Sequence, residues 1–303
     1  MPKPLVSIVT INYRQARVTG ALLASLRRIS YPRVEIIVVD NASPPAEVDP
    51  IAAQFPEVRL IRSAENLGFA GGNNLGIAAA QGEYVLFLNN DTEVAPGFLE
   101  PLVALFEATP TAGVASPKII YHGTDHLIQY AGCSGINPWT GRSVTTGHLE
   151  KDHGQHDATA PTALAHGAAM LVPRRLIQQV GLMPALYFLY YEELDWCEMM
   201  KRAGHGCHYV GASTVYHKES ASVGQGSVLR THYLYRNRLL FIRRNLTGAR
   251  FWSAALFFVL VAVPKQGLVF TLRREWGHLR ALWRGLRWHL RPHDVHHNDY
   301  LPS

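Results

Sequence analysis

The chain has 303 residues, enough for one large α/β domain with an appendage or for two small domains, and its hydrophobic content of 48% argues against disorder. Three cysteines without a Cys-x-x-Cys spacing argue against a disulfide framework and against a thiolate zinc site. The net charge of +6 is concentrated after Arg230, which predicts an anionic partner, either nucleic acid or an anionic membrane surface.

The first half of the chain alternates short β-branched apolar runs with helical spacing. Four buried strands are predicted at 5–11, 34–39, 58–61 and 84–88. Four helices are predicted at 16–29, 45–54, 72–81 and 97–108. This alternation predicts an α/β fold with a Rossmann-like, mostly parallel sheet and flanking helices. Ligands bind beyond the carboxyl ends of the strands in such sheets, so polar residues at those ends are candidate site residues.

Periodicity is lost between Tyr121 and Pro161, a stretch rich in Gly, His, Thr and Pro. We interpret this stretch as a long loop region over the sheet, with room for short strands. A strand pattern returns from Leu164, and helices are predicted at 173–180 and 195–203.

Polar side chains follow the first two predicted strands. Asn12 follows the first strand, and Asp40, Asn41 and Ser43 follow the second. A carboxylate at a strand end can accept hydrogen bonds from a ribose or from a base edge. The alternative is that Asp40 caps the next helix.

A glycine-rich segment, Asn66 to Asn74, precedes the third predicted helix. Its glycines, Gly68 among them, allow close backbone approach or a positive φ, and the N-terminus of the following helix favours an anion such as a diphosphate. The segment is neither a G-x-G-x-x-G fingerprint nor a Walker loop, and a plain glycine turn is the alternative.

The fourth predicted strand is followed directly by Asn89, Asn90 and Asp91. One carboxylate flanked by amides can hold a hard divalent cation that already carries diphosphate oxygens, although a turn built on Asn and Asp gives the same pattern. His217 ends another short strand. A lone histidine is more often structural, and it gains weight as a ligand only if it converges with Asp91.

Three acids, Glu192, Glu193 and Asp195, stand within four residues at the start of a predicted helix. Carboxylates this close repel one another unless they are solvated, paired or near a cation. The pattern fits a general base whose pKa is tuned by its neighbours. Ordinary acids at a helix N-terminus are the alternative.

The last part of the chain differs in composition. Residues 251–270 are almost wholly apolar but are interrupted by Pro264 and Lys265, so we expect a hairpin or a shallow insertion instead of a simple span. An apolar stripe with helical spacing follows, flanked by six arginines, as in a helix that lies in a membrane interface. The stripe comprises Leu272, Trp276, Leu279, Trp283, Leu286 and Leu290, and the arginines are Arg273, Arg274, Arg280, Arg284, Arg287 and Arg291. A coiled-coil seam or a core-packed helix is the alternative, and 293–303 is expected to be a loose polar end.

In this order the motifs resemble family 2 glycosyltransferases with the GT-A fold, and within them the rhamnosyltransferase-like branch. The resemblance covers about residues 5–245 and includes the segment His166 to Met170. It implies a catalytic domain over 1–245, and we expect a membrane-associating tail over 246–303. The residues that it implies for binding the nucleotide sugar are Thr10, Asn12, Asp40, Asn41, Ser43, Asn66, Gly68, Asn73, Asn89 and Asn90.

The resemblance also implies a metal site. Asp91 and His217 would hold Mg²⁺ or Mn²⁺. Asn89 stands where the family commonly has Asp, which lowers the negative charge of the site, so modest metal affinity is expected.

The acidic cluster would supply the catalytic base. Glu193 stands where the family usually has Asp, which leaves the choice among Glu193, Glu192 and Asp195 open. The Gln-x-x-Arg-Trp signature of processive synthases is absent, and Tyr235-Arg236-Asn237-Arg238 occupies the corresponding region. We therefore expect an enzyme that adds a single sugar.

The function implied is an inverting, metal-assisted transfer of a sugar, with rhamnose a candidate, from a UDP- or dTDP-sugar to a hydroxyl of a glycan or a polyprenyl-linked acceptor. The tail and the absence of a signal-peptide pattern favour a peripheral or monotopic protein at the cytoplasmic face of a membrane, with no nucleic acid as partner. A nucleotidyltransferase and a nucleic-acid-binding protein with a basic tail are the alternatives.

Overall fold

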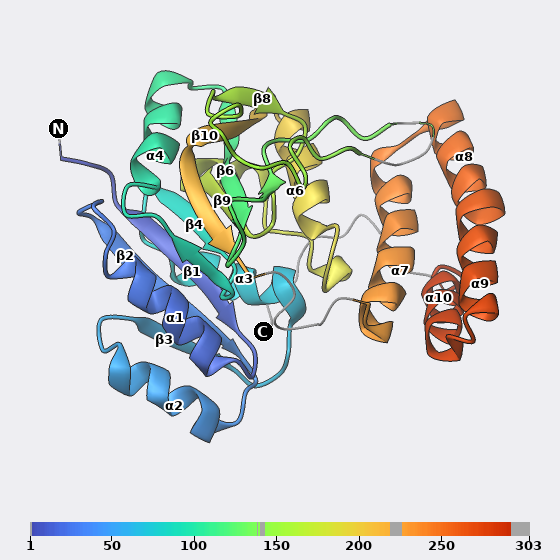
Figure 1. Ribbon diagram of the computed structural model, residues 1–303, viewed down its shortest axis with the longest axis horizontal. Helices are drawn as coiled ribbons and strands as arrows, with labels where there is room; N and C mark the ends of the chain where they lie inside the picture. Colours follow the sequence, from blue (N-terminus) through green and yellow to red (C-terminus); the bar gives the residue numbers. More distant parts are fainter. Residues whose placement is uncertain (1, 138, 140–142, 219–225, 292–303) are drawn as a thin grey trace.

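Ten strands form one sheet, and a group of helices stands beside it in the computed structural model (Figure 1). The structure describes residues 2–137, 139, 143–218 and 226–291, so the predicted loose end at 293–303 lies outside the described residues. The strands are β1 (Val6–Asn12), β2 (Val34–Asn41), β3 (Arg59–Ser63), β4 (Tyr84–Leu88), β5 (Thr92–Val94), β6 (Ala112–Tyr121), β7 (Ile128–Tyr130), β8 (Ala160–Thr162), β9 (Ala169–Pro173) and β10 (Gly206–His217). The helices that accompany the sheet are α1 (Ala16–Leu26), α2 (Pro45–Gln54), α3 (Gly68–Ala79), α4 (Leu99–Ala108), α5 (Arg174–Val180), the 3-10 turn η1 (Ala185–Tyr187) and α6 (Glu192–Arg202).

The sheet runs in the order β3-β2-β1-β4-β9-β6-β10-β5, with β7 beside β6 and β8 beside β10. Strands β3, β2, β1 and β4 are parallel, whereas β9 is antiparallel to β4 and β6, and β5 is antiparallel to β10. The predicted α/β class with flanking helices is confirmed. The parallel arrangement holds for the first half, and the sheet as a whole is mixed because β9 and β5 enter it in the reverse direction.

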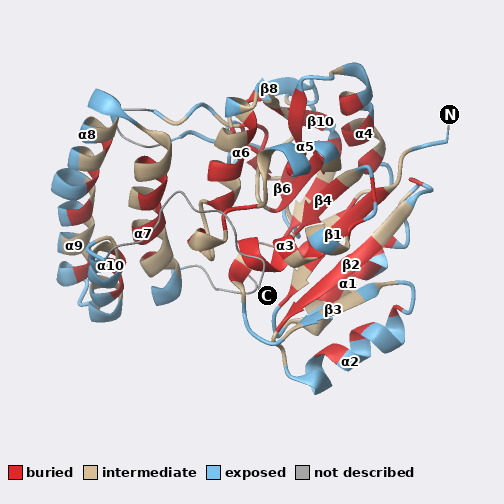
Figure 2. Cartoon of the chain, turned by 180° about the vertical axis from the view of Figure 1, so that it is seen from behind, coloured by how far each residue is buried: buried red, intermediate tan, exposed pale blue. Residues whose placement is uncertain are grey.

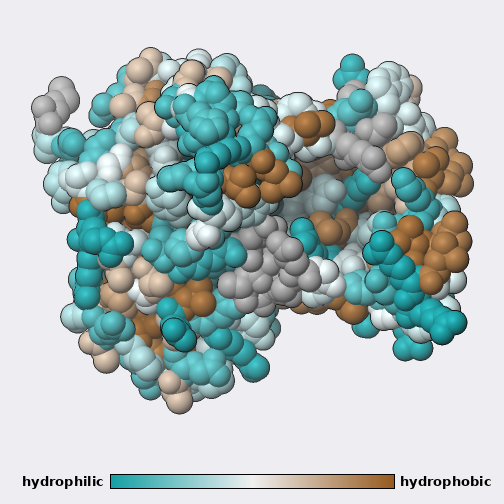
Figure 3. All heavy atoms as spheres, in the orientation of Figure 1, coloured by the Kyte–Doolittle hydropathy of each residue, from teal (hydrophilic) through white to brown (hydrophobic). Residues whose placement is uncertain are grey.

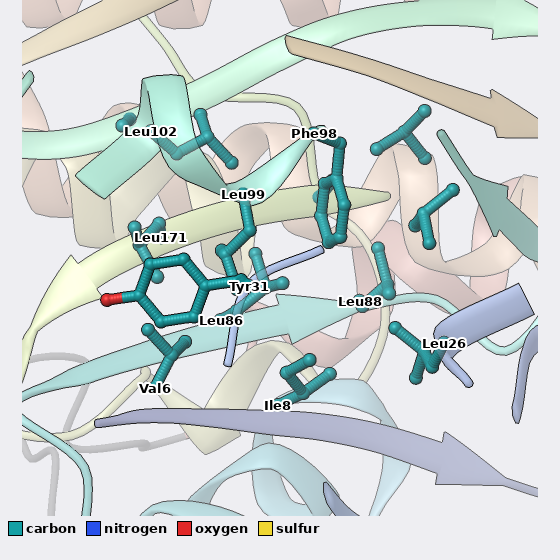
Figure 4. Packing of buried hydrophobic residues seen from close by; sticks show 14 of the residues in the cluster. Val6, Ile8, Leu26, Tyr31, Leu86, Leu88, Phe98, Leu99, Leu102 and Leu171 are labelled. Atoms are coloured by element: carbon teal, nitrogen blue, oxygen red, sulfur yellow. The ribbon is translucent and has the colours of Figure 1, made fainter. Parts of the chain in front are cut away.

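The parallel strands are covered by helices on both faces, as their continuous apolar runs predict. On one face α1 and α4 pack against β1 and β4, with Leu26, Phe98 and Leu99 in the apolar cluster (Figure 4). On the other face the Trp196 ring of α6 meets the edge of the Phe87 ring of β4 at 5.4 Å between centroids. This packing fixes the carboxyl ends of β1, β2 and β4 at one edge of the sheet.

The glycine-rich segment is helical and is not a loop. Helix α3 begins at Gly68, before the predicted start at residue 72. Gly72 and Gly76 face β1 so closely that an added Cβ would lie 2.9 Å from Cδ1 of Ile11 and 2.2 Å from Cγ1 of Val9, respectively. Gly72 and Gly76 thus serve close helix–strand packing, while Gly68, at φ 69°, adopts a backbone conformation that favours glycine.

The loop region between Tyr121 and Pro161 is fastened to the sheet. It contains β7, and Nζ of the buried Lys118 on β6 donates to Asp152 at 2.9 Å and to Asp157 at 2.5 Å. These ion pairs hold a segment that has little regular structure of its own against the strand beneath it.

Four helices make up a second unit, with α7 at its inner side (Figures 1 and 2). They are α7 (Val228–Asn245), α8 (Gly248–Phe257) continued by the π-helical turn η2 (Phe258–Ala262) and α9 (Val263–Leu272), and α10 (Trp276–Trp288). The unit has its own apolar cluster, in which Ile242, Phe258 and Leu282 are fully buried. Packing therefore groups α7 with the tail, whereas the expected division at 245/246 separates them.

Helices α8 and α9 run as one helix from Gly248 to Leu272, so of the two expected arrangements, a hairpin or a shallow insertion, the hairpin is not formed. Proline cannot donate a helical hydrogen bond, and the backbone widens to π-helical bonding over 258–262, just before it. This is the one helix of the described residues that is long and apolar enough to cross a membrane, and only 17% of its most apolar window is buried. Figure 3 shows apolar side chains gathered along the outer side of α8 and α9.

Candidate active site

A cavity of about 460 Å³ lies at the carboxyl ends of β1 and β4, where the sequence predicts the site. Ten of the predicted site residues line it: Asn41, Asn66, Gly68, Asn73, Asn89, Asn90, Asp91, Glu192, Glu193 and His217. The other five, Thr10, Asn12, Asp40, Ser43 and Asp195, are not among its lining residues. Segments from both halves of the sheet and from α6 therefore meet around one hollow.

Thr10, Asn12, Asp40 and Ser43 do not line the cavity, and the last three of them are hydrogen-bonded to one another. Nδ2 of Asn12 donates to Oδ1 of Asp40 at 2.8 Å, and the backbone N–H of Ser43 donates to Oδ2 at 3.0 Å. Both carboxylate oxygens of Asp40 thus have partners within the protein, but Asp40 does not cap the next helix, because the N-cap of α2 is Pro44 and receives no side-chain hydrogen bond. The buried hydroxyl of Thr10 has no hydrogen-bond partner among the described residues.

Asn41 and Asn66 shape the wall of the cavity at the start of α3. Nδ2 of Asn41 donates to the Gly68 carbonyl at 2.8 Å, and Oδ1 of Asn66 accepts from the Gly68 N–H at 2.9 Å. The side chains of these two residues hold the chain reversal that begins α3.

Asn73 offers an unused donor to the cavity. Its side chain is 2% exposed, and Nδ2 has no hydrogen-bond partner among the described residues. A buried donor without a partner costs free energy unless a ligand or a water satisfies it. By contrast, Nδ2 of Asn90 is already engaged with Oγ1 of Thr19 at 3.1 Å.

Asp91 and His217 meet because β5 pairs with β10 in antiparallel register, which sets Thr92 opposite His217. Nε2 of His217 lies 3.1 Å from Oδ1 of Asp91, and Nδ1 lies 2.7 Å from Oε1 of Gln129. Both side chains are buried. The predicted convergence of these two residues is therefore present in the structure.

A divalent cation fits this pair with substrate oxygens as further ligands. The described residues contain no group of three or more His, Cys, Asp or Glu side chains that could hold a metal ion. Mg²⁺ is usually bound through one or two carboxylates together with substrate phosphates and water, so the small protein donor set is compatible with a metal that arrives with a diphosphate.

His166 lies behind the pair. Its ring centroid is 6.0 Å from that of His217, and its Nδ1 accepts from the Ala168 N–H at 3.1 Å. Burial, with the neighbouring His217, lowers the pKa of His166 to about 3. A neutral imidazole therefore faces the site at physiological pH.

Glu192 and Glu193, the first residues of α6, both line the cavity. The Oε2 atoms of both are buried without a hydrogen-bond partner among the described residues. Burial raises the pKa of Glu193 and, reinforced by its neighbour, raises the pKa of Glu192 well above its ordinary value. An added Cβ at Gly167 would lie 3.4 Å from Oε1 of Glu193, so this glycine leaves room for that carboxylate.

Asp195 does not reach the cavity, which corrects its place among the candidate bases. It is fully buried, with Arg244 donating to Oδ2 at 2.5 Å and Asn245 donating to Oδ1 at 2.6 Å. Asp195 thus joins α6 to α7, because two positions along a helix turn a side chain about 200° away from Glu193. Of the three acids, only Glu192 and Glu193 therefore line the cavity.

Gln129, Arg230 and His166 are among the lining residues for which no role was predicted. Gln129 lies in the stretch without periodicity, so no pattern singled it out. Arg230, which lies 6.0 Å from the centre of the Tyr190 ring, was read only as the start of the basic tail. His166 belongs to a motif that contributed to the family resemblance, and that motif was the available signal.

The comparisons with known proteins agree with this architecture. The model of the family "Glycosyl transferase family 2" matches residues 7–180. An uncharacterized protein of Sinorhizobium fredii is 30% identical over 260 residues, which are 80% of this chain but only 27% of that protein. The N-acetylglucosaminyl-diphospho-decaprenol L-rhamnosyltransferase of Mycobacterium tuberculosis is 24% identical, over 84% of this chain and 88% of that protein.

Solved structures share the fold. GalNAc-T7 with UDP, GalNAc and Mn²⁺ matches with a TM-score of 0.62 and 17% identity, over 79% of this chain and 48% of that chain. The mannosyltransferase PcManGT from Pyrobaculum calidifontis, in complex with GDP-Man and Mn²⁺, matches with a TM-score of 0.58 and 17% identity, over 95% and 87%.

Fold and family together define a glycosyltransferase of the GT-A class. The chain belongs to glycosyltransferase family 2. This assignment excludes the nucleotidyltransferase alternative.

Proposed function

We propose that the protein is an inverting, metal-assisted glycosyltransferase that moves a sugar, with rhamnose a candidate, from a UDP- or dTDP-sugar to a hydroxyl of a polyprenyl-linked glycan. One observation carries the proposal: a single cavity brings the Asp91–His217 pair together with the Glu192–Glu193 pair. A single displacement requires a group that can stabilise the negative charge of the leaving diphosphate and a group that can accept the proton of the acceptor hydroxyl.

Glu193 is the proposed base. It takes the proton of the acceptor hydroxyl as that oxygen attacks the anomeric carbon, and the configuration inverts because there is one displacement. Burial brings its pKa above the ordinary value and nearer to neutrality, where proton transfer is most efficient. A negative charge on Glu193 raises the pKa of Glu192, so ionisation of one acid opposes ionisation of the other.

The donor would lie along β1, β2 and the start of α3. The nucleoside would lie at the carboxyl ends of β1 and β2, where Asn41 and Asn66 line the cavity and Asn12 and Asp40 support the turn to Ser43. The unused Nδ2 of Asn73 fits an oxygen of the diphosphate or the sugar. When bound, Mg²⁺ or Mn²⁺ held by Asp91 and His217 would neutralise negative charge on the leaving nucleoside diphosphate.

Attachment to an anionic membrane is the second part of the proposal. The outward side chains of α8–α9 leave large apolar surfaces in solvent, with Trp252 64%, Leu260 66% and Leu268 60% exposed. On α10, Trp276 and Trp283 are half exposed, and the six flanking arginines are exposed. Apolar and aromatic surface bordered by arginines suits a headgroup region. We place the protein at the cytoplasmic face, peripheral or monotopic.

The acceptor class follows from that attachment. A protein held at a membrane surface by α8–α10 meets acceptors that are themselves in the membrane. The relative from Mycobacterium tuberculosis is named for a decaprenol-linked substrate, which supports a polyprenyl-linked acceptor here.

A donor screen tests the proposed function. UDP- and dTDP-sugars are added with Mg²⁺ or Mn²⁺, and melting temperature and release of nucleoside diphosphate are measured. The proposal expects one donor to raise the melting temperature and to release nucleoside diphosphate when acceptor is present. Turnover that is equally fast in EDTA would refute metal assistance.

A further inference from the structure

The chain just before the acidic pair has an unusual backbone. Phe188, Tyr190 and Tyr191 have φ values of 64°, 69° and 79°, and none of them is glycine. Positive φ is unfavourable for residues with a bulky Cβ substituent and persists where surrounding contacts impose it. We call residues 186–191 the acid turn, because this segment leads directly into Glu192 of α6.

Two side chains of helix α7 donate hydrogen bonds to backbone carbonyls of the acid turn. Asn237 is fully buried, and its Nδ2 donates to the carbonyls of Tyr187 at 3.0 Å, Leu189 at 2.7 Å and Tyr190 at 2.7 Å. The neighbouring Arg236 donates to the Leu186 carbonyl at 2.9 Å and also to the Tyr187 carbonyl. Two adjacent residues of one helix thus donate to four backbone carbonyls between Leu186 and Tyr190.

Helix α3, on the other side of the acid turn from α7, also binds it. The Phe69 N–H of α3 donates to the Phe188 carbonyl at 2.6 Å. An added Cβ on Gly68 would lie 2.2 Å from that carbonyl oxygen, so only glycine permits this approach. The acid turn is therefore fixed between α3 and α7.

Two residues at the end of α10, Trp288 and His289, contact Arg236. The Arg236 guanidinium lies 5.1 Å from the Trp288 ring centre and 4.7 Å from that of Tyr233. Nε2 of His289 lies 2.8 Å from the Arg236 carbonyl oxygen. The end of α10, a helix of the proposed membrane surface, thus contacts Arg236 of α7, which holds the acid turn.

We propose that Asn237 and Arg236 are positioning residues, which hold the acid turn in its strained form and so keep Glu192 and Glu193 directed into the cavity. The inference rests on the proposed role of the acidic pair. It makes α7 and the end of α10 part of the catalytic apparatus, beyond any role in membrane attachment.

The primary test is Asn237→Asp. This variant keeps the shape of the side chain and the oxygen that accepts from Nε of Arg236 at 2.7 Å, but it loses both N–H donors. Misplacement of the acids by about 1 Å is expected to lower kcat about 10²-fold. The KM and Kd for the donor sugar nucleotide should stay within about 3-fold, because the residues proposed to bind it are not moved. Asn237→Ser provides the same loss without a buried charge, in case the aspartate variant does not fold.

Thr231→Val is the matched control. Thr231 is also a buried polar residue of α7, but its hydroxyl bonds Nδ1 of His278 on α10 at 2.8 Å and does not touch the acid turn. It should lower the melting temperature while leaving kcat per folded molecule unchanged.

The pH profile separates positioning from loss of stability. The ionisable groups that face the acids are Arg236 from α7, Tyr187 and Tyr191 from the acid turn, and Cys197 from α6. A loosened turn admits water to the carboxylates, so the acidic limb of the kcat profile of the Asn237 variants should move to lower pH. A change that only unfolds a fraction of the molecules lowers the amplitude and leaves the limb in place.

Folded Asn237 variants with wild-type kcat and an unshifted acidic limb would overturn the inference, as would a loss of activity that matches the unfolded fraction. Glu192→Gln and Glu193→Gln are measured beside them. If both are fully active, the proposed role of the acids fails. If Glu193→Gln is inactive while the Asn237 variants are normal, only the positioning inference fails.

Discussion

Nε2 of His217 lies 3.1 Å from Oδ1 of Asp91, although 126 positions separate these residues in the sequence. The contact is made by the register of β5 on β10, and it sits in the same cavity as the Glu192–Glu193 pair. The proposed single-displacement reaction depends on the presence of both pairs in one cavity.

Removal of the Asp91 carboxylate should abolish metal-dependent turnover and leave the fold intact. We expect Asp91→Ala to lower donor turnover by about 10² or more, since one of two protein ligands is lost. Mn²⁺ affinity, measured by electron paramagnetic resonance, should fall in parallel. Asp49→Ala, which removes a carboxylate from an exposed ion pair with Arg62, is the control. Full activity of Asp91→Ala in EDTA is incompatible with the metal site.

Glu193→Gln keeps the shape of the side chain and removes its basicity, so kcat should fall by about 10² or more with donor binding unchanged. Asp195→Asn should behave differently, because it leaves the buried guanidinium of Arg244 without its ion-pair partner. We expect a loss of about 3–5 kcal/mol in the free energy of unfolding and near-normal kcat for the folded fraction. A crippled kcat in Asp195→Asn with normal stability would return the role of base to Asp195.

The buried acids also predict how stability depends on pH. Burial raises the pKa of Glu192 well above its ordinary 4.5, so the fold favours the protonated form. That contribution is fully present below pH 4.5 and is lost as pH rises through the higher folded-state pKa. Glu192→Gln cannot ionise, so its melting temperature should match the wild type at pH 4 and exceed it at pH 8. An equal difference at both pH values would contradict this explanation.

Gly76→Ala tests the packing of α3 on β1. The new Cβ would lie 2.2 Å from Cγ1 of Val9, so we expect a loss of about 1–3 kcal/mol in the free energy of unfolding, measured by urea titration. Gly20→Ala is the matched substitution in α1, where the nearest atom is 3.7 Å away. It should be neutral or stabilising by up to about 1 kcal/mol. Equal effects at both sites would mean that helix propensity, and not close approach, decides the outcome.

The arginines of α10 should control binding to anionic vesicles. Arginine near such a surface contributes about 1 kcal/mol, so replacing Arg280, Arg284 and Arg287 by Gln should weaken partitioning about 10²-fold. Salt should release the wild type only in part, because apolar burial of the neighbouring side chains is insensitive to salt. Arg33→Gln, at the other end of the molecule, should have no effect. Preference for duplex DNA over vesicles would contradict a membrane surface.

Much of the catalytic half could be predicted because its signals are local. The strand and helix patterns around Asn12, Asp40 and Asp91 gave the sheet, and residues at the carboxyl ends of parallel strands necessarily share an edge. The start of α3 is at Gly68 and not at the predicted residue 72, since periodicity cannot show that Gly72 is required by the approach of the helix to Ile11 of the neighbouring strand.

The contacts that position the acids of α6 could not be predicted from the sequence. Asp195 and Arg244 stand 49 positions apart, and so do Arg236 and the Tyr187 carbonyl, so their pairing depends on how α7 docks. The continuity of α8 and α9 through Pro264 depends on a local change of helix type that composition does not reveal.

The anomeric configuration of the product tests the central claim most directly. Purified enzyme, the accepted UDP- or dTDP-sugar, Mn²⁺ and a polyprenyl-linked acceptor are followed by proton NMR from the start of the reaction. The account predicts that the first product has the anomeric configuration opposite to that of the donor, with one nucleoside diphosphate released for each sugar transferred. A first product that retains the configuration of the donor would contradict the single displacement and, with it, the assigned role of Glu193.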